Sequence, residues 1–190
     1  EADHLMGCVY DGRKEMPGWD KAGFATDAWQ PVVTGDKPQA VFTAYPGEPV
    51  RMTEELRTKS VSEPKPGVFV FDLGQNMVGW ARLKISGTPG QKVVLRFAEM
   101  LNDDGTPYTA NLRSARATDT FFLKGGAEET LEPAFTFHGF RYVEVTGLTA
   151  AAKPDAAMIT GIVVHSDLAR TGSFECSNPM VNQLFSNIFW

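Results

Sequence analysis

Residues 67–168 constrain the fold most, because short apolar runs alternate there with glycine- and proline-containing turns and no helical periodicity is visible. At 81–85 the apolar Ala81, Leu83 and Ile85 share one face of a strand, and charged residues occupy the other. Comparable runs occur at 68–73, 93–97, 120–123, 135–146 and 158–165. Several strands of this length, joined by such turns, predict a mainly β chain folded as an antiparallel β-sandwich of the jelly-roll kind.

The stretch FDLGQNMVGW at residues 71–80 lies between two of these predicted strands. Its centre, GQNM, is typical of a tight turn, because glycine and amide side chains satisfy backbone groups at corners. Trp80 has the opposite parity from Ala81, so we expect its side chain on the outer face. There it either packs against a neighbouring domain, which is the favoured interpretation, or stacks on a sugar.

Several charged residues have the parity of core residues, and an unpaired buried charge is very costly, so we expect them to form pairs. Arg141 points inward unless a bulge at Gly139 shifts the register of its strand. A structural salt-bridge network is favoured over a catalytic one. The carboxylates concerned are Asp72, Glu99 and Asp119.

Before residue 67 the pattern is irregular. Residues 1–45 are rich in turns, and in MPGWDKAGFATDAW the aromatic residues Trp19, Phe24 and Trp29 are expected to anchor a loop onto a β-sheet. Residues 46–66 contain four prolines and are predicted to be a linker or extended lead-in, with one strand near 50–53.

The end of the chain has a different period. In SNPMVNQLFSNIFW the apolar residues are spaced as on one face of an amphipathic helix. Ser177 is the expected N-cap, and Pro179 is tolerated in the first turn. Since such a stripe must be buried, we expect the native chain to continue into a helical domain.

The longest region without a strand pattern is LNDDGTPYTANLRSARATD, residues 101–119. Long ordered loops are disproportionately functional, and this one carries side chains suited to hydroxyls or carboxylates. Its NDDG start lacks the ligand spacing of a calcium-binding EF-hand loop, so a plain turn is favoured. Together with Trp80, the candidate substrate-binding residues are Tyr108, Asn111, Arg113 and Arg116.

Composition narrows the function further. The net charge is −5 and no cluster of lysine and arginine stands out, so neither nucleic acid nor membrane is an expected partner. Cys8 and Cys176 are far apart and are interpreted as unrelated free thiols. The three histidines do not cluster, and we predict no metal site and no cofactor. No Ser-His-Asp set, phosphate loop or dinucleotide motif is present, so we assign no catalytic residue.

Six phrases in order resemble the bacterial α-L-rhamnosidases of glycoside hydrolase family seventy-eight, and together they cover nearly the whole chain. They are YDGRKEMPGWDKAGF, PGEPVRMTEEL, PGVFVFDLGQNMVGWARLKISG, AEMLNDDGTPYTANLRSARATDTFFLKG, EPAFTFHGFRYVEVTG and VVHSDLARTGSFECSNPMVNQLFSNIFW. Gly12 departs from the alanine expected in the first phrase.

The resemblance implies an architecture and an activity. Residues 1–45 would be the tail of an accessory β-domain, 46–171 a concanavalin-like β-sandwich, and 172–190 the first helix of an (α/α)₆ catalytic barrel on which the sandwich packs. The family removes terminal α-L-rhamnose from rhamnose-containing glycosides with inversion, using two carboxylates. The resemblance places both beyond Trp190. Some members bind sugar and calcium in an accessory domain, but no such ligand is assigned to a residue here.

Two alternatives remain open beside a non-catalytic segment of a rhamnosidase. The chain is either a free-standing carbohydrate-binding module, which exposed Trp80 and Tyr108 would favour, or a structural spacer that supports the barrel.

Overall fold

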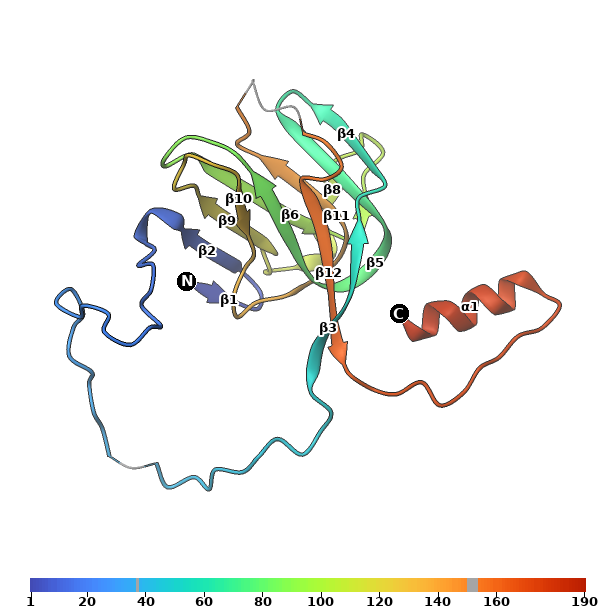
Figure 1. Ribbon diagram of the computed structural model, residues 1–190. Helices are drawn as coiled ribbons and strands as arrows, with labels where there is room; N and C mark the ends of the chain where they lie inside the picture. The colour runs from blue at the N-terminus through green and yellow to red at the C-terminus, as the bar shows by residue number, and fades with distance from the viewer. Residues whose placement is uncertain (37, 150–153) are drawn as a thin grey trace.

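The structure is a computed structural model that describes residues 1–36, 38–149 and 154–190. It is mainly β, with one α-helix near the end of the described residues (Figure 1). The strands are β1 (Ala2–Asp3), β2 (Gly7–Asp11), β3 (Val50–Arg57), β4 (Ser60–Lys65), β5 (Val68–Ile85), β6 (Lys92–Ala98), β7 (Met100–Leu101), β8 (Pro107–Tyr108), β9 (Thr118–Phe122), β10 (Glu129–Leu131), β11 (His138–Thr146) and β12 (Ile159–Ser166). The helices are the 3-10 turns η1 (Gly12–Lys14) and η2 (Ala110–Leu112) and the α-helix α1 (Pro179–Phe189).

The strands form a curled sheet in the order β1-β2-β9-β6-β11-β5-β12-β3, with β4 and β10 also paired to β5. β7 and β8 form a separate small hairpin. The predicted sandwich class is confirmed, with one refinement. β2 pairs with β9 in parallel, so the sheet is mixed rather than purely antiparallel. The first residues of the chain therefore extend the sheet that begins at residue 50.

The predicted turn at residues 74–77 is wrong, because β5 runs through these residues as one continuous strand. Its odd-numbered side chains face the core, and Phe71, Leu73, Met77 and Leu83 are at most 2% exposed. The first half of β5 pairs with β4, and the second half pairs with β12 and β10. Curling of this single long strand, rather than a turn, carries the chain between the two parts of the sheet (Figure 1).

Gly79 lies where β5 meets strands on both sides, opposite His138 of β11 and Val163 of β12. Its φ is +152°, and a Cβ at this position would overlap the backbone carbonyl oxygen of Ile162. The requirement for glycine at position 79 is therefore close approach of backbones in a strand.

The core lies inside the curl. The largest side chains with less than 2% exposure are Phe71, Phe97, Phe121, Phe140, Leu73, Leu83, Leu95, Leu123, Ile159 and Ile162. They come from β5, β6, β9, β11 and β12 and from the residue after β9. These strands therefore share one continuous hydrophobic core.

A bulge in β11 decides the orientation of Arg141. The register against β5 shifts between Phe140 and Tyr142, beyond Gly139, which pairs regularly with Val78. The register shift that was left open for this strand therefore occurs, at Arg141 rather than at Gly139, so Arg141 does not follow the core parity. Phe135 and Phe137, which precede it in the sequence, do not point inward either. Phe135 is 93% exposed and Phe137 is 49% exposed.

Arg141 forms an ion pair with Asp72, one of the three carboxylates expected to need a partner. Nε and Nη2 of Arg141 donate to the two carboxylate oxygens of Asp72 at 2.8 Å each. The hydrogen bond from Arg141 lowers the pKa of Asp72, burial opposes this shift, and the backbone N–H of Gly74 adds to it. The pair lies on the surface of the sandwich, with the Arg141 side chain 39% exposed.

Asp72→Asn is expected to lower the free energy of unfolding by about 1 kcal/mol at neutral pH. A carboxyl whose pKa is lowered by folding contributes stability above its unfolded pKa, near about 4, and loses it as the pH falls through the folded value. The difference between wild type and variant should therefore shrink below about pH 4. Urea unfolding over a pH series measures it. Asp167→Asn, in the more exposed pair with Arg51, is the control with a smaller effect. A difference that stays constant down to about pH 2 would contradict the assignment.

Asp119 is the expected carboxylate that does point inward, and its partner is a histidine. Its Oδ1 lies 3.1 Å from Nε2 of His138 and accepts a hydrogen bond from the backbone N–H of Cys8 at 2.9 Å. Asp119 has no exposed surface, and the ring of Phe97 stacks on His138 with centroids 4.3 Å apart. The carboxylate thus links β9, β11 and the N-terminal strand β2.

Glu99 does not point inward as expected. It follows the end of β6 at Ala98, where the alternation stops, and it is exposed. Its carboxylate accepts hydrogen bonds from Nδ2 of Asn76 at 3.0 Å and Nδ2 of Asn111 at 3.3 Å.

Residues 46–66 contain more structure than the predicted linker. β3 covers the expected strand near 50–53 and continues to Arg57, and β4 follows. The prolines were misleading, because β4 includes Pro64 where its register against β5 shifts between Ser62 and Lys65.

The C-terminal helix forms where the periodicity predicts it. Its N-cap is Asn178 rather than Ser177, since the Asn178 side chain accepts a hydrogen bond from the backbone N–H of Met180. None of its residues is buried, and the apolar stripe of the helix is exposed or half-buried. Within the described ranges no helix is long and apolar enough to cross a membrane.

Candidate functional site

Three of the four hydrogen-bonded turns between residues 16 and 29 end in an aromatic residue. The backbone N–H of Trp19 donates to the carbonyl of Met16, that of Phe24 to Lys21, and that of Trp29 to Thr26. In the first turn, Pro17 followed by Gly18 at a φ of +84° fits the central positions of a type II turn. The spacing of five residues between the aromatics thus reflects a repeated turn.

The turns bring the aromatic rings together. The ring centroids of Trp19 and Trp29 are 6.4 Å apart with planes at 33°, and the edge of Phe24 meets Trp29 at 6.1 Å. Trp19 is 62% exposed and Trp29 is 44% exposed. The expectation that these aromatics pin a loop onto the sheet is therefore wrong for the two indoles, which are largely exposed.

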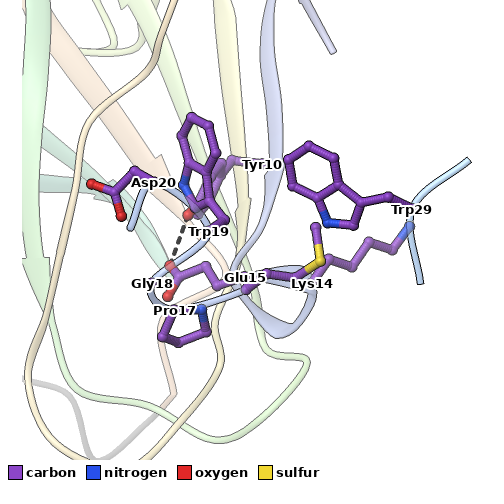
Figure 2. A pocket seen from close by; sticks show the side chains of 9 residues that line it. Tyr10, Lys14, Glu15, Pro17, Gly18, Trp19, Asp20 and Trp29 are labelled. Atoms are coloured by element: carbon purple, nitrogen blue, oxygen red, sulfur yellow. Dashed lines mark hydrogen bonds between the residues drawn. The ribbon is translucent and has the colours of Figure 1, made fainter. Parts of the chain in front are cut away.

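The two indoles line an open pocket of about 610 Å³, which we name the indole pocket (Figure 2). Its other walls include Tyr10, Lys14 and Asp20. Figure 2 shows Trp19 and Trp29 on either side, with the hydrogen bond between Tyr10 and Glu15 drawn beneath Trp19. The pocket combines aromatic faces with charged groups of both signs.

Hydrogen bonds through Glu15 fix the pocket to the sheet. The hydroxyl of Tyr10 donates to Oε1 of Glu15 at 2.7 Å, and Nζ of Lys124 donates to Oε2 at 2.8 Å. The bond from Lys124, followed by that from Tyr10, lowers the pKa of Glu15. Burial, followed by the bond to Glu15, raises the pKa of Tyr10 to about 12. Glu15 is thus ionised at neutral pH and Tyr10 is a neutral donor.

Of the residues predicted to bind substrate, four lie together in the loop between β6 and β9. Tyr108 is in β8 opposite Met100 and is 42% exposed. Asn111 in η2 contacts Glu99, and Arg113 directly follows η2. Arg116 is exposed, and its backbone N–H donates to the carbonyl of Leu5.

This loop carries unusual backbone angles. Arg113 has a φ of 55° and Ala117 a φ of 44°, and neither is a glycine. Such conformations persist only where the surroundings enforce them, and they cluster at ligand-binding sites. The start of the loop forms a hydrogen-bonded turn, with Oδ1 of Asp104 accepting from the backbone N–H of Thr106 at 3.0 Å.

Trp80 is not brought to that loop. It pairs with Ile162 of β12, and its Nε1 donates to Glu132 at 2.6 Å. Glu132 also binds Arg82, whose other end contacts Glu55. Trp80 shares the outer face with Arg82 as expected, but its ring is half-buried and its N–H is already occupied.

The described residues contain no group of three or more His, Cys, Asp or Glu side chains arranged to hold a metal ion. Cys8 and Cys176 are both free thiols. Burial raises the pKa of the Cys8 thiol to about 12, which keeps it protonated and unreactive at neutral pH.

Sequence reasoning missed the polar side of the indole pocket. Glu15 and Lys124 are 109 residues apart, so no local pattern joins them. The regular spacing of Trp19, Phe24 and Trp29 was the one signal that could have revealed the aromatic side.

Comparison with known proteins finds family matches for both the N-terminal residues and the sandwich of this chain. Residues 62–165 match the bacterial alpha-L-rhamnosidase concanavalin-like domain, and residues 1–54 match the alpha-L-rhamnosidase N-terminal domain. An alpha-L-rhamnosidase of Streptomyces avermitilis is 56% identical over 191 residues, which cover 100% of this chain and 18% of the relative. One of Formosa agariphila is 41% identical, covering 97% of this chain and 20% of the relative.

Solved structures that resemble this chain are also alpha-L-rhamnosidases. The Streptomyces avermitilis alpha-L-rhamnosidase complexed with L-rhamnose superposes with a TM-score of 0.94 at 55% identity, covering 100% of this chain and 18% of that one. The native enzyme from Aspergillus terreus gives 0.93 at 40% identity, covering 100% and 22%. The chain thus spans about a fifth of the length of the relatives it matches.

Proposed function

This chain belongs to the bacterial alpha-L-rhamnosidase family, and from that membership we propose that it is a non-catalytic β-sandwich segment of an enzyme that hydrolyses terminal α-L-rhamnosides. The observation that carries the proposal is the match of the whole chain, at 55% identity and a TM-score of 0.94, to a rhamnosidase crystallised with L-rhamnose. Rhamnose-containing glycosides are the proposed substrates of the complete protein.

Hydrolysis with inversion needs two carboxyl groups about 6.5–9.5 Å apart, one protonating the leaving oxygen and one activating water on the opposite face of the sugar. The buried or paired carboxylates described above have structural partners: Asp119 holds His138, Asp72 holds Arg141 and Glu15 holds Tyr10 and Lys124. We therefore assign the acid and base to the part of the enzyme outside this chain.

The proposed organisation has three parts. Residues 1–45 are the tail of an accessory β-domain, of which β1 and β2 join the sheet of the sandwich. Residues 46–171 are the concanavalin-like sandwich, and 172–190 the opening of a helical catalytic domain. The exposed stripe of α1 supports the last assignment, since Leu184 is 58% exposed and Ile188 is 73% exposed. Further helices of the same protein would bury these side chains, and the sandwich would pack beside them.

Sugar contact by the loop between β6 and β9 remains a proposal. The strained backbone at Arg113 and the exposed ring of Tyr108 support it, with Asn111 and Arg116 alongside. Trp80 is the weakest member of the proposed set, because its N–H is held by Glu132. Its position on the outer face fits packing against a neighbouring domain better than sugar stacking.

Hydrolysis of 4-nitrophenyl α-L-rhamnopyranoside tests the proposed function. The 190-residue chain is expected to release no 4-nitrophenol above the uncatalysed rate, whereas the longer protein that contains it releases the product. Heat-inactivated longer protein is the control. A longer protein that is inert on every rhamnoside tried would contradict the proposal, and so would activity of the chain alone.

A further inference from the structure

We propose that residues 167–178, which we name the connector, hold α1 in one orientation against the sandwich, and that Arg170 closes this arrangement. The connector runs from the end of β12 to the start of α1. The contacts that support this role all lie within the chain, and only its consequence for a complete enzyme rests on the proposed function.

Hydrogen bonds fix both ends of the connector. At the sandwich, the backbone N–H of Asp167 donates to the carbonyl of Pro49 at 2.9 Å, and its carboxylate lies 3.0 Å from Nε of Arg51. At the helix, the Asn182 side chain accepts from the backbone N–H of Cys176 at 2.9 Å and donates to the carbonyl of the same residue at 2.8 Å. The amide of Asn182 thus binds the connector through both its oxygen and its nitrogen.

Arg170 joins the start of the connector to the end of α1. The central carbon of its guanidinium lies 4.2 Å from the ring centroid of Phe189 and 5.3 Å from that of Phe185. Its Nε donates to the carbonyl of Gly172 at 3.1 Å, which holds the side chain in place. A guanidinium within about 6 Å of an aromatic face is attracted by the ring quadrupole. Arg170 therefore connects two segments that no other named hydrogen bond joins at this end.

Aromatic contacts fill the space between these two points. The rings of Phe185 and Phe189, one helical turn apart, meet at 4.9 Å with planes at 69°. The ring of Phe174 in the connector lies 5.6 Å from that of Phe185. Asn182 and Phe185 are half-buried, whereas the other residues of α1 are exposed. The partly covered face of α1 is therefore the face that the connector contacts.

The contacts also fix the direction of α1. The start of the connector meets the end of the helix and its end meets the start of the helix, so the two segments are antiparallel and α1 returns toward the sandwich (Figure 1). There Phe189 and Trp190 line a recess of about 420 Å³ whose other walls include Val78 of β5 and Val164 of β12. The end of α1 is thus placed beside these two strands.

The length of α1 makes such support necessary. It has 11 residues, and helices shorter than about 12–15 residues are marginal in water without tertiary contacts. The superposition with the Streptomyces avermitilis enzyme covers 100% of this chain, α1 included, at a TM-score of 0.94. This agreement supports one orientation of α1 with and without further helices around it. In a complete enzyme the connector would seat the catalytic domain on the sandwich.

Amide hydrogen exchange on the 190-residue chain tests this role. We expect the backbone amides of α1 to be protected, and Arg170→Ala to raise their exchange rates at least about tenfold. Arg170→Lys keeps the charge but loses the planar group over the rings, so it should lose part of the protection. Arg57→Ala, at an exposed position of β3, is the matched control and should leave α1 unchanged. Urea unfolding of the sandwich should match wild type in all three variants.

A double-mutant cycle shows whether Arg170 acts through Phe189. Phe189→Ala should also loosen α1, and the double variant should lose little more protection than Phe189→Ala alone. Losses that add in the double variant would mean that Arg170 does not act through this ring, and the role assigned to it would be overturned.

Electron–electron double resonance measures the orientation of α1 itself. Spin labels are placed at Val50→Cys in β3 and Met180→Cys in α1, both exposed, in a Cys176→Ser background. We expect a narrow distribution of distances that broadens in Arg170→Ala. A broad distribution before that substitution, or an equally narrow one after it, would overturn the inference.

The outcomes are distinguishable from those that test the proposed function. If the longer protein hydrolyses rhamnosides but α1 is unprotected in the 190-residue chain, the role of the connector is overturned and the proposed function stands. If α1 is protected and Arg170→Ala loosens it, while the longer protein is inert on every rhamnoside tried, the connector is supported and the proposed function is overturned.

Discussion

Gly79→Ala is expected to lower the free energy of unfolding by about 4 kcal/mol or to prevent folding. The added Cβ would overlap the carbonyl oxygen of Ile162, which is backbone and cannot swing aside, and the φ of +152° is unfavourable for alanine. Relief would require β5 and β12 to separate where they are hydrogen-bonded. Urea unfolding followed by far-ultraviolet circular dichroism measures the loss.

Gly139→Ala is the matched control for this prediction. Gly139 lies in β11 opposite Val78, has no positive φ, and has open space where a Cβ would be placed. Its replacement should change the free energy of unfolding by less than about 1 kcal/mol. If the two variants had the same stability, close backbone approach at Gly79 would not be the reason for glycine there.

Asp119→Ala is expected to lower the free energy of unfolding by about 3–5 kcal/mol, because it leaves two buried groups without their hydrogen-bond acceptor at once. The substitution leaves the Cys8 N–H and the His138 ring without their acceptor in a site with no exposed surface. Because Cys8 belongs to β2, this strand should also loosen from β9. Chemical denaturation gives the stability, and amide exchange in β2 and β9 tests the loosening.

Asp119→Asn preserves an acceptor at Oδ1 and is expected to cost less, about 1–2 kcal/mol. Its new amide would stand where Oδ2 has no hydrogen-bond partner, so the variant is not neutral. An alanine variant as stable as the asparagine variant would show that the hydrogen bonds of Asp119 contribute little.

The periodic parts of the fold could be predicted from the sequence, because alternation and helical spacing are local. β6, β9 and α1 lie where these patterns place them. The continuity of β5 was missed because Gly74 and the amides after it favour a turn in isolation. Odd-numbered residues continue inward past Gln75 to Met77, and only pairing with β11 and β12 fixes this.

The candidate sites also divide into features that local sequence predicts and features that depend on contacts between distant segments. Nearness of Tyr108, Asn111 and Arg113 follows from their place in one loop, so sequence sufficed to group them. The bulge at Arg141 depends on how β11 meets β5, and the link from Glu15 to Lys124 depends on where β9 ends. Such contacts form between segments distant in sequence, and local periodicity contains no information about them.

The continuous β5 has a consequence for how the sandwich loses its structure. One end of this strand is bonded to β4 and the other to β12 and β10, so neither half of the protein possesses a complete set of strands by itself. A partly melted form that keeps one half intact would need β5 ordered over half its length and frayed over the rest. Denaturation is therefore expected to be all-or-none across both halves.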